Sequence, residues 1–257
     1  MDYESLFSLR GKHVVIIGGS GYLGEILTKL FVGTKSKVTC FGRDEKKLIR
    51  ISKKIASNNL KTININIQEI TKEIYLKNTF NDGKVDVLIN LAFTDFLRGF
   101  FNDISIDKLD EHASTHFKNY IYPLKFFSKF LNKNSSIIIF NSIWSIVSPN
   151  PINHKLLNNL PTVTQSFVKS GLVGLTRQLA VEFAPKGIRV NSISPGYFPK
   201  KRGKSNPKYI NQLKSEIPLF RIGKPNDLEG ISILLASHAS SYITGQNLIV
   251  DGGYTIK

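Results

Sequence analysis

The sequence predicts an α/β protein, a Rossmann-type doubly wound parallel sheet of about seven strands with helices on both faces. Short runs of consecutive apolar residues, which suit strands buried on both faces of a sheet, alternate with longer amphipathic stretches. A glycine-rich turn follows the first apolar run. With 257 residues and 41% hydrophobic content the chain can bury one core, so we expect a single domain over residues 1–257.

Residues 13–27, HVVIIGGSGYLGEIL, combine a strand, a turn and the start of a helix. Three glycines at three-residue spacing permit a tight turn, close approach of backbone to a pyrophosphate, and packing of the helix on the strand. The helix N-terminus would direct N–H groups at the phosphates. This pattern predicts a dinucleotide site, and an ordinary strand-to-helix turn is the alternative. The expected cofactor contacts are Gly18, Ser20, Gly21, Tyr22, Leu23 and Gly24.

The end of the second strand, residues 37–41, sets the expected cofactor preference. An acidic residue there would bind the ribose 2′-hydroxyl of NAD, whereas an arginine can pair with the 2′-phosphate of NADP. Arg43 occupies this edge, so NADP(H) is expected in preference to NAD(H). The alternative is that Arg43 is simply solvated ahead of a helix over residues 44–57, for which Asp44 is the predicted N-cap.

The alternation of strands and helices continues to the C-terminus. Further strands are predicted over residues 62–67, 85–90, 136–140, 188–193 and 247–250, and further helices over 71–80, 106–131, 163–183 and 225–237. Residues 143–164 carry three prolines and little periodicity, which indicates a long loop of the kind that tends to be functional. Repeated βαβ units specify a parallel sheet with right-handed crossovers.

The formal charge of +16 is compatible with a nucleic acid, a membrane surface or an anionic substrate as partner. There is no paired Cys/His spacing and no aromatic-basic RNA motif, so we expect no nucleic-acid partner. Neither a signal sequence nor an apolar run of membrane-spanning length is visible. The lone cysteine, Cys40, excludes an internal disulfide. These observations predict a cytoplasmic protein without a membrane partner.

The C-terminal half carries the most specific pattern. Residues 169–196, KSGLVGLTRQLAVEFAPKGIRVNSISPG, and 239–255, ASSYITGQNLIVDGGYT, resemble the compact subgroup of the short-chain dehydrogenase/reductase family, and the resemblance covers nearly the whole chain. The GxxGxxG loop looks more like the extended or atypical subgroups. The proline-containing loop after Ser142 resembles members from surface-polysaccharide and flagellin-sugar biosynthesis. The resemblance implies hydride transfer between a nicotinamide and a carbonyl or carbinol carbon.

The resemblance also implies catalytic roles. Ser142 matches the serine that polarises the substrate oxygen, and Lys169 matches the lysine that holds the nicotinamide ribose. In the family, a tyrosine four residues before that lysine exchanges the hydroxyl proton, because a nearby cation helps a phenol to ionise. Gln165 stands there instead, and an amide has no ionisable proton near neutral pH. His116 replaces an asparagine that supports a relay water, and is either a titrating group or an ordinary helix histidine.

Two further departures concern the cofactor site. Phe93 replaces the glycine of the family's Asn-Asn-Ala-Gly turn, and Asn66 stands where an aspartate usually meets the adenine. An amide can still bind an exocyclic amine, so the second change is mild. The remaining cofactor contacts that the resemblance implies are Asn66, Ile67, Asn90, Ala92, Lys169, Pro195 and Gly196.

We therefore expect an NAD(P)-dependent oxidoreductase with an atypical or impaired site. Its substrate would be a small polar molecule, with a sugar derivative as one candidate. The alternative is a catalytically inactive nucleotide-binding subunit that partners an active paralogue. A third possibility is an elimination or dehalogenation reaction on the same fold, against which the intact glycine loop argues.

Two more expectations concern regions around the site. The segment of about 198–217 is expected to be a substrate lid, and its basic residues favour an anionic sugar phosphate or nucleotide sugar, with a solvated basic loop as the alternative. These basic residues are Lys200, Lys201, Arg202 and Lys204. The helices predicted over 106–131 and 163–183 are apolar on more than one face, and the resemblance implies that they pair across a two-fold axis. A homodimer or homotetramer is therefore expected.

Overall fold

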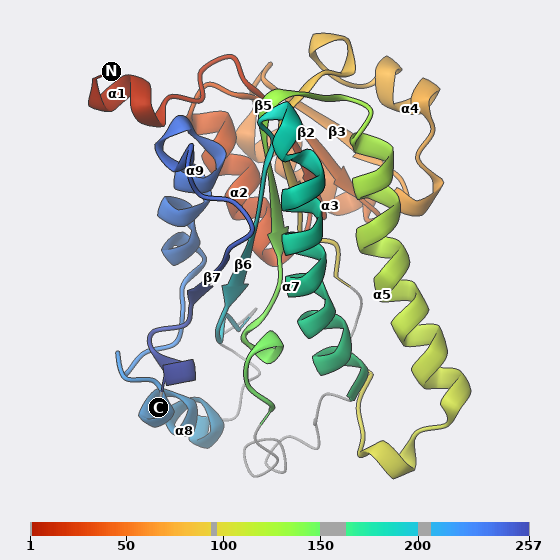
Figure 1. Cartoon of the computed structure of the whole chain (residues 1–257), viewed down its shortest axis with the longest axis vertical. Helices are drawn as coiled ribbons and strands as arrows, with labels where there is room; N and C mark the ends of the chain where they lie inside the picture. Colours follow the sequence, from red (N-terminus) through yellow and green to blue (C-terminus); the bar gives the residue numbers. More distant parts are fainter. Residues whose placement is uncertain (1, 94–96, 150–162, 200–206, 257) are drawn as a thin grey trace.

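The computed structural model describes residues 2–93, 97–149, 163–199 and 207–256. Within them, seven strands form one sheet with the order β3-β2-β1-β4-β5-β6-β7, and every neighbouring pair is parallel. Figure 1 shows helices on both sides of this sheet. The strand order reverses between β1 and β4, as in a doubly wound fold. The predicted fold class is confirmed.

The strands are β1 His13–Ile17, β2 Lys37–Gly42, β3 Leu60–Asn64, β4 Val85–Asn90, β5 Leu131–Phe140, β6 Arg189–Pro195 and β7 Asn247–Val250. The helices are α1 Tyr3–Phe7, α2 Tyr22–Gly33, α3 Glu45–Ile55, α4 Lys72–Lys77, α5 Ile106–Phe127, α7 Val163–Phe183, α8 Pro207–Glu216 and α9 Glu229–Ala236. None of the helices in the described ranges is long and apolar enough to cross a membrane.

Several elements differ from the sequence-based expectation: α4, α5 and α9 are shorter than predicted, α8 lies in a segment where no helix was predicted, and three further elements differ as follows. A short helix, α1, lies in the predicted polar lead-in, where the Asp2 side chain caps it by accepting from the Ser5 amide. Strand β3 ends at Asn64 because Asn66 starts a 3-10 turn, in which its side chain accepts from the Gln68 amide. Strand β5 begins five residues before the expected start at Ser136.

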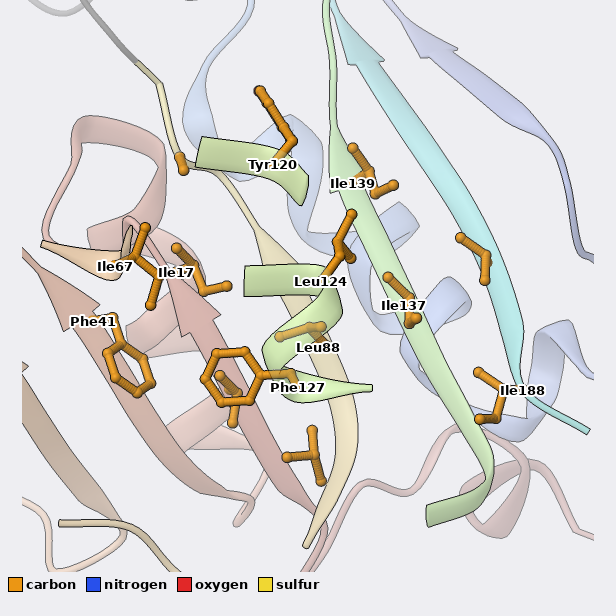
Figure 2. Packing of buried hydrophobic residues seen from close by; sticks show 14 of the residues in the cluster. Ile17, Phe41, Ile67, Leu88, Tyr120, Leu124, Phe127, Ile137, Ile139 and Ile188 are labelled. Atoms are coloured by element: carbon orange, nitrogen blue, oxygen red, sulfur yellow. The ribbon is translucent and has the colours of Figure 1, made fainter. Parts of the chain in front are cut away.

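Alternation of side chains along the strands divides the core into two layers. Val15 and Ile17 pack toward α5 and α7, whereas Val14 and Ile16 pack toward α2 and α9. Figure 2 shows the first layer, with Phe127 of α5 lying over the strands. Burial of both faces explains the apolar runs over residues 14–17 in β1 and 87–89 in β4. The carboxyl ends of these strands are thereby held rigidly at one edge.

Candidate functional site

A cavity of about 870 Å³ opens at the carboxyl ends of the strands, on either side of the point where the strand order reverses. Ligands of open α/β sheets bind in this crevice. Residues at the ends of five strands line it, namely Ile17, Gly42, Leu91, Phe140 and Pro195. Helices α5, α7 and α8 supply the remaining wall through residues such as Asn119, Lys169 and Leu213. The cavity therefore joins the glycine loop to the predicted catalytic residues.

The glycine loop after β1 has the geometry that a phosphate cradle requires. Gly18 has a φ of +78°, and a Cβ there would lie 2.9 Å from the Leu91 carbonyl oxygen. A Cβ on Gly24 would clash with the carbonyl oxygen of Gly18. Gly21 is the N-cap of α2, and its amide donates to the Gly18 carbonyl at 2.9 Å. Only glycines permit this close packing, so the loop fits a dinucleotide pyrophosphate at the N-terminus of α2.

The remaining residues expected in this loop lie at the same place. The structure brings Ser20, Tyr22 and Leu23 to the cavity together with the three glycines. Ser20 also lies tightly against Gly42 at the end of β2. A Cβ added to Gly42 would clash with the Ser20 hydroxyl. The phosphate cradle and the end of β2 are thus parts of one surface.

Charged residues that directly follow β2 also line the cavity. Arg43 is exposed and lines the cavity beside Asp44 and Lys47. Asp44 caps α3 by accepting from the Lys47 amide at 3.0 Å, and its carboxylate pairs with the Lys47 ammonium at 2.6 Å. Hydrogen bonds from the Lys47 side chain and backbone lower the pKa of Asp44. Asn66 and Ile67 line the cavity next to this group.

The turn after β4 is shaped by Asn90, which is fully buried. Its Oδ1 accepts from the Ala92 amide at 2.9 Å, and its Nδ2 donates to the Asn119 carbonyl at 3.3 Å. The next side chain is Phe93, whose ring centroid lies 5.4 Å from the Lys169 ammonium. A phenylalanine therefore adds an aromatic wall here. Ala92 lines the cavity, as do Pro195 and Gly196 at the end of β6.

Ser142 and Lys169 both line the cavity. Ser142 follows β5, and its Oγ accepts from the Trp144 amide at 3.3 Å. Lys169 lies on α7 with only 2% of its surface exposed. The side-chain amide of Asn141 donates to the Lys169 backbone carbonyl at 3.1 Å and so ties α7 to the end of β5. The predicted serine and lysine are thus fixed near each other by neighbouring elements.

Sequence reasoning missed Tyr120 of α5. Its hydroxyl donates to the Phe140 carbonyl at 3.1 Å and accepts a hydrogen bond from the Lys169 ammonium at 3.0 Å. Tyr120 also lines the cavity. The available signal was its spacing, because a residue four positions after His116 lies on the same helix face one turn further along.

Gln165 is held by two histidines of α5. Its Nε2 lies 3.3 Å from Nε2 of His116 and 3.4 Å from Nε2 of His112. The Leu97 amide also donates to His112 Nε2, so this nitrogen is an acceptor and His112 Nδ1 carries the proton that it donates to Thr164 Oγ1 at 2.8 Å. The amide group of Gln165 is therefore the donor to both imidazoles. Gln165 also lines the cavity.

His116 is completely buried and is not among the residues that line the cavity. Burial lowers its pKa to about 3, with smaller contributions from the positive charge of Lys169 and from the neighbouring imidazole of His112. Its imidazole is consequently neutral at physiological pH. The structure brings His116 next to Gln165 and separates it from the cavity by that side chain.

Part of the expected lid lies outside the described residues. Lys200, Lys201, Arg202 and Lys204 belong to this part. Residues 150–162 of the predicted long loop, a separate segment, also lie outside the described residues. Of the rest, Phe198, Pro199 and two residues of α8, Tyr209 and Leu213, line the cavity. Another basic residue, Arg98, also lines it.

Comparison with known proteins gives matches over most or all of the chain. Residues 28–255 match the family model described as enoyl-(acyl carrier protein) reductase. The chain is 31% identical to the 3-oxoacyl-[acyl-carrier-protein] reductase FabG of Rickettsia conorii, over 96% of this chain and 98% of that protein. It is 27% identical to NADPH-dependent aldehyde reductase 1 of Arabidopsis thaliana, over 100% of this chain and 90% of that protein.

Solved structures show the same architecture. A short-chain type dehydrogenase/reductase from Mycobacterium marinum superposes with a TM-score of 0.84 at 25% identity, and the match covers 100% of both chains. A short-chain dehydrogenase from Leptospira borgpetersenii with bound NAD⁺ has a TM-score of 0.80 at 28% identity, over 99% of this chain and 97% of that one.

Proposed function

Because the chain belongs to the short-chain dehydrogenase/reductase family of oxidoreductases, we propose that it transfers a hydride between a nicotinamide cofactor and a carbonyl or hydroxyl carbon of a small polar substrate. The observation that carries this proposal is that the glycine loop, Ser142 and Lys169 all line one cavity. Such a cavity lets one ligand reach from the phosphate cradle to the reacting groups.

The proposed cofactor is NADP(H). The glycine loop would hold the pyrophosphate, Asn66 the adenine and Lys169 the nicotinamide ribose. Arg43 would pair with the 2′-phosphate, which a guanidinium can bind through two parallel hydrogen bonds. When bound, the nicotinamide supplies or accepts the hydride. One relative is named NADPH-dependent and one structural neighbour holds NAD⁺, so the preference rests on Arg43.

Ser142 and Lys169 would handle the substrate oxygen. The Ser142 hydroxyl would donate a hydrogen bond to it, and the Lys169 ammonium, directly or through a water, would hold the proton that the oxygen gains on reduction. His116 is less suited to this task, because its imidazole is neutral and lies outside the cavity lining. The amide of Gln165 has no proton that ionises near neutral pH. We therefore propose a site that is impaired in proton transfer.

The charges around the cavity favour anionic ligands, and Arg98 is the basic lining residue that the proposed cofactor contacts leave for the substrate. Four basic residues and one acidic residue line it among the described residues, namely Arg43, Lys47, Arg98, Lys169 and Asp44. The acidic residue is already paired with Lys47. An excess of positive charge raises the local concentration of anions. A phosphorylated or nucleotide-linked sugar fits this charge, and its ring could stack on the aromatic residues Trp144 and Phe198 in the wall.

The proposal is tested by calorimetry with NADPH and NADH, and by the absorbance change of NADPH with a panel of carbonyl compounds and sugar derivatives. We expect NADPH to bind more tightly than NADH, and Arg43→Asp to narrow or reverse the difference. Lys169→Met should reduce turnover. Lys186→Met should not, because Lys186 is exposed in the turn that follows α7 and does not line the cavity. Absence of binding by either nucleotide at millimolar concentration would refute the proposal.

The same assay distinguishes the proposed enzyme from a nucleotide-binding subunit without activity. The feature that would favour such a subunit is Gln165, whose amide hydrogens are already engaged by two imidazoles. Tight binding of NADPH without turnover of any carbonyl would support the subunit. Capture of a tyrosine-containing paralogue on the immobilised protein would then identify its partner.

A further inference from the structure

The Lys169 ammonium is buried in a cavity wall that offers it no carboxylate among the described residues. Its exposed surface is 2%, and none of the ion pairs in the described ranges includes it. A buried ammonium is costly unless hydrogen-bond acceptors compensate for the lost water. The acceptor that the structure describes for it is the hydroxyl of Tyr120, at 3.0 Å from Nζ.

The Tyr120 hydroxyl is itself fixed in direction. Its proton is donated to the Phe140 carbonyl at 3.1 Å, so a lone pair faces Lys169. The ring is 2% exposed and lies on the face of α5 that packs against the sheet, along with Leu124 and Phe127 (Figure 2). A packed ring with an oriented hydroxyl is a rigid acceptor.

Gln165 does not compete for this ammonium. Its amide nitrogen donates to His112 and His116, and its Oε1, the atom that could accept from Lys169, has no hydrogen-bond partner among the described residues. Aromatic rings surround the ammonium on other sides, with centroids at 5.1 Å for Tyr120 and 5.4 Å for Phe93. Lys169 has three N–H donors, and the bond to Tyr120 uses one of them. The others remain for a ligand in the cavity that Lys169 lines.

From this geometry we infer that Tyr120 is the positioning residue of Lys169. The phenol of Tyr120 on α5 holds the ammonium and directs it at the ligand. Gln165, on α7, has no phenol with which to do this. The inference rests on the proposed function and deepens it, since it assigns to α5 the control of the lysine that would bind the cofactor ribose.

The test is a double-mutant cycle on NADPH affinity, measured by nucleotide fluorescence in four proteins: the natural chain, Tyr120→Phe, Lys169→Met, and both together. Tyr120→Phe keeps the ring and removes only the hydroxyl. It should weaken NADPH binding by about three- to tenfold in the natural chain, because the ammonium loses its oriented acceptor. In the Lys169→Met background the same change should alter binding by less than about twofold.

Tyr75→Phe is the matched control. Tyr75 is also buried, and its hydroxyl donates to a backbone carbonyl, that of Gly83, at 2.8 Å, but it does not line the cavity. The Tyr75→Phe substitution should leave the NADPH affinity unchanged. Equal weakening by Tyr120→Phe in both backgrounds, or an effect no larger than that of Tyr75→Phe, would overturn the inference while the proposed function stands. Failure of the natural chain to bind NADPH would overturn the proposed function itself.

Discussion

At the scale of single residues, the arrangement around Gln165 decides what chemistry the site can do. Its amide links two imidazoles, and its carbonyl oxygen is buried without a hydrogen-bond partner among the described residues. An unpaired buried acceptor does not stabilise a fold. The glutamine is therefore better explained by the cavity it lines than by packing.

Restoring a phenol at this position tests whether the rest of the site is competent. Gln165→Tyr would place a phenol four residues before Lys169, one helix turn away on the same face of α7. General acid–base catalysis contributes typically about 10²- to 10⁴-fold, so we expect turnover of a carbonyl substrate to rise by at least about tenfold. Steady-state NADPH oxidation measures this, with Gln165→Phe as the control that adds the ring without the hydroxyl.

Two results would contradict this prediction. Natural protein that already turns over at rates ordinary for enzymes, roughly 1 to 10³ per second, would show that another group transfers the proton. Equal turnover of the tyrosine and phenylalanine variants would show that the hydroxyl is irrelevant. Ser142→Ala would then reveal whether the serine carries the step.

Burial of His116 predicts a dependence of stability on pH. Its pKa is lowered from 6.5 to about 3 in the folded protein, so between these values the unfolded chain binds a proton that the folded chain does not. Stability must therefore fall as pH falls below about 6.5, by up to about 1.4 kcal/mol per pH unit for this one group. Urea unfolding at pH 7 and pH 5 should show this loss.

His116→Gln is the variant that isolates the effect, because it removes the titrating group and keeps a polar side chain. The difference in unfolding free energy between pH 7 and pH 5 should shrink by about 1–2 kcal/mol. Some dependence should remain, because burial also lowers the pKa of His13. An unchanged slope in His116→Gln would show that His116 is accessible to protons in the folded state.

At the scale of elements, the sequence predicted best where burial leaves a strong pattern. Strand β4 and helix α7 were predicted with their observed bounds, since a short, mostly apolar run and a regular helical spacing leave clear patterns. The start of β5 was missed because residues 131–135 are mostly polar and pair only at the rim of the sheet, across a register shift at Val85. The start of β5 is therefore set by its pairing with β4, which the local sequence does not show.

The site divides in the same way. The glycine loop was predicted from its spacing, and Ser142 and Lys169 were predicted from the resemblance of the sequence around them to the family. The contact between Tyr120 and Lys169 could not be predicted, since it depends on how α5 crosses α7. The partners of Gln165 depend on the same crossing. Contacts between elements distant in sequence need the three-dimensional packing.

The loop between β1 and α2 yields a prediction with an internal control. Gly24→Ala would drive a Cβ into the Gly18 carbonyl, which must shift the phosphate cradle. We expect NADPH affinity to fall by at least about tenfold, because backbone donors at the helix N-terminus act only when aligned. Gly33→Ala, in the same helix with nothing within 4 Å of its added Cβ, should leave affinity unchanged. Equal affinities for the two variants would contradict the cradle.

At the scale of the whole molecule, α5 and α7 leave apolar residues uncovered. Phe117 of α5 is 60% exposed and Phe167 of α7 is 72% exposed, and both helices lie on the same face of the sheet. Exposed aromatic residues on neighbouring helices are typical of protein interfaces. This observation supports the proposed homo-oligomer.

A two-fold axis through these helices would place each helix against its counterpart in a second copy, so that one substitution acts twice in each interface. Light scattering at micromolar concentration should therefore give a mass of at least two chains. Phe167→Glu should shift it toward one chain, because two carboxylates would be buried in an apolar contact without partners. Ile49→Glu, which introduces the same charge at an exposed isoleucine of α3, should leave the mass unchanged. A monomeric mass for the natural chain would rule out the oligomer. A multimeric mass that both variants retain would place the interface on another face.

The interface should also affect the site, because Gln165 and Lys169 lie on α7. If assembly holds that helix in position, the loss of dimer contacts in Phe167→Glu should also weaken NADPH binding.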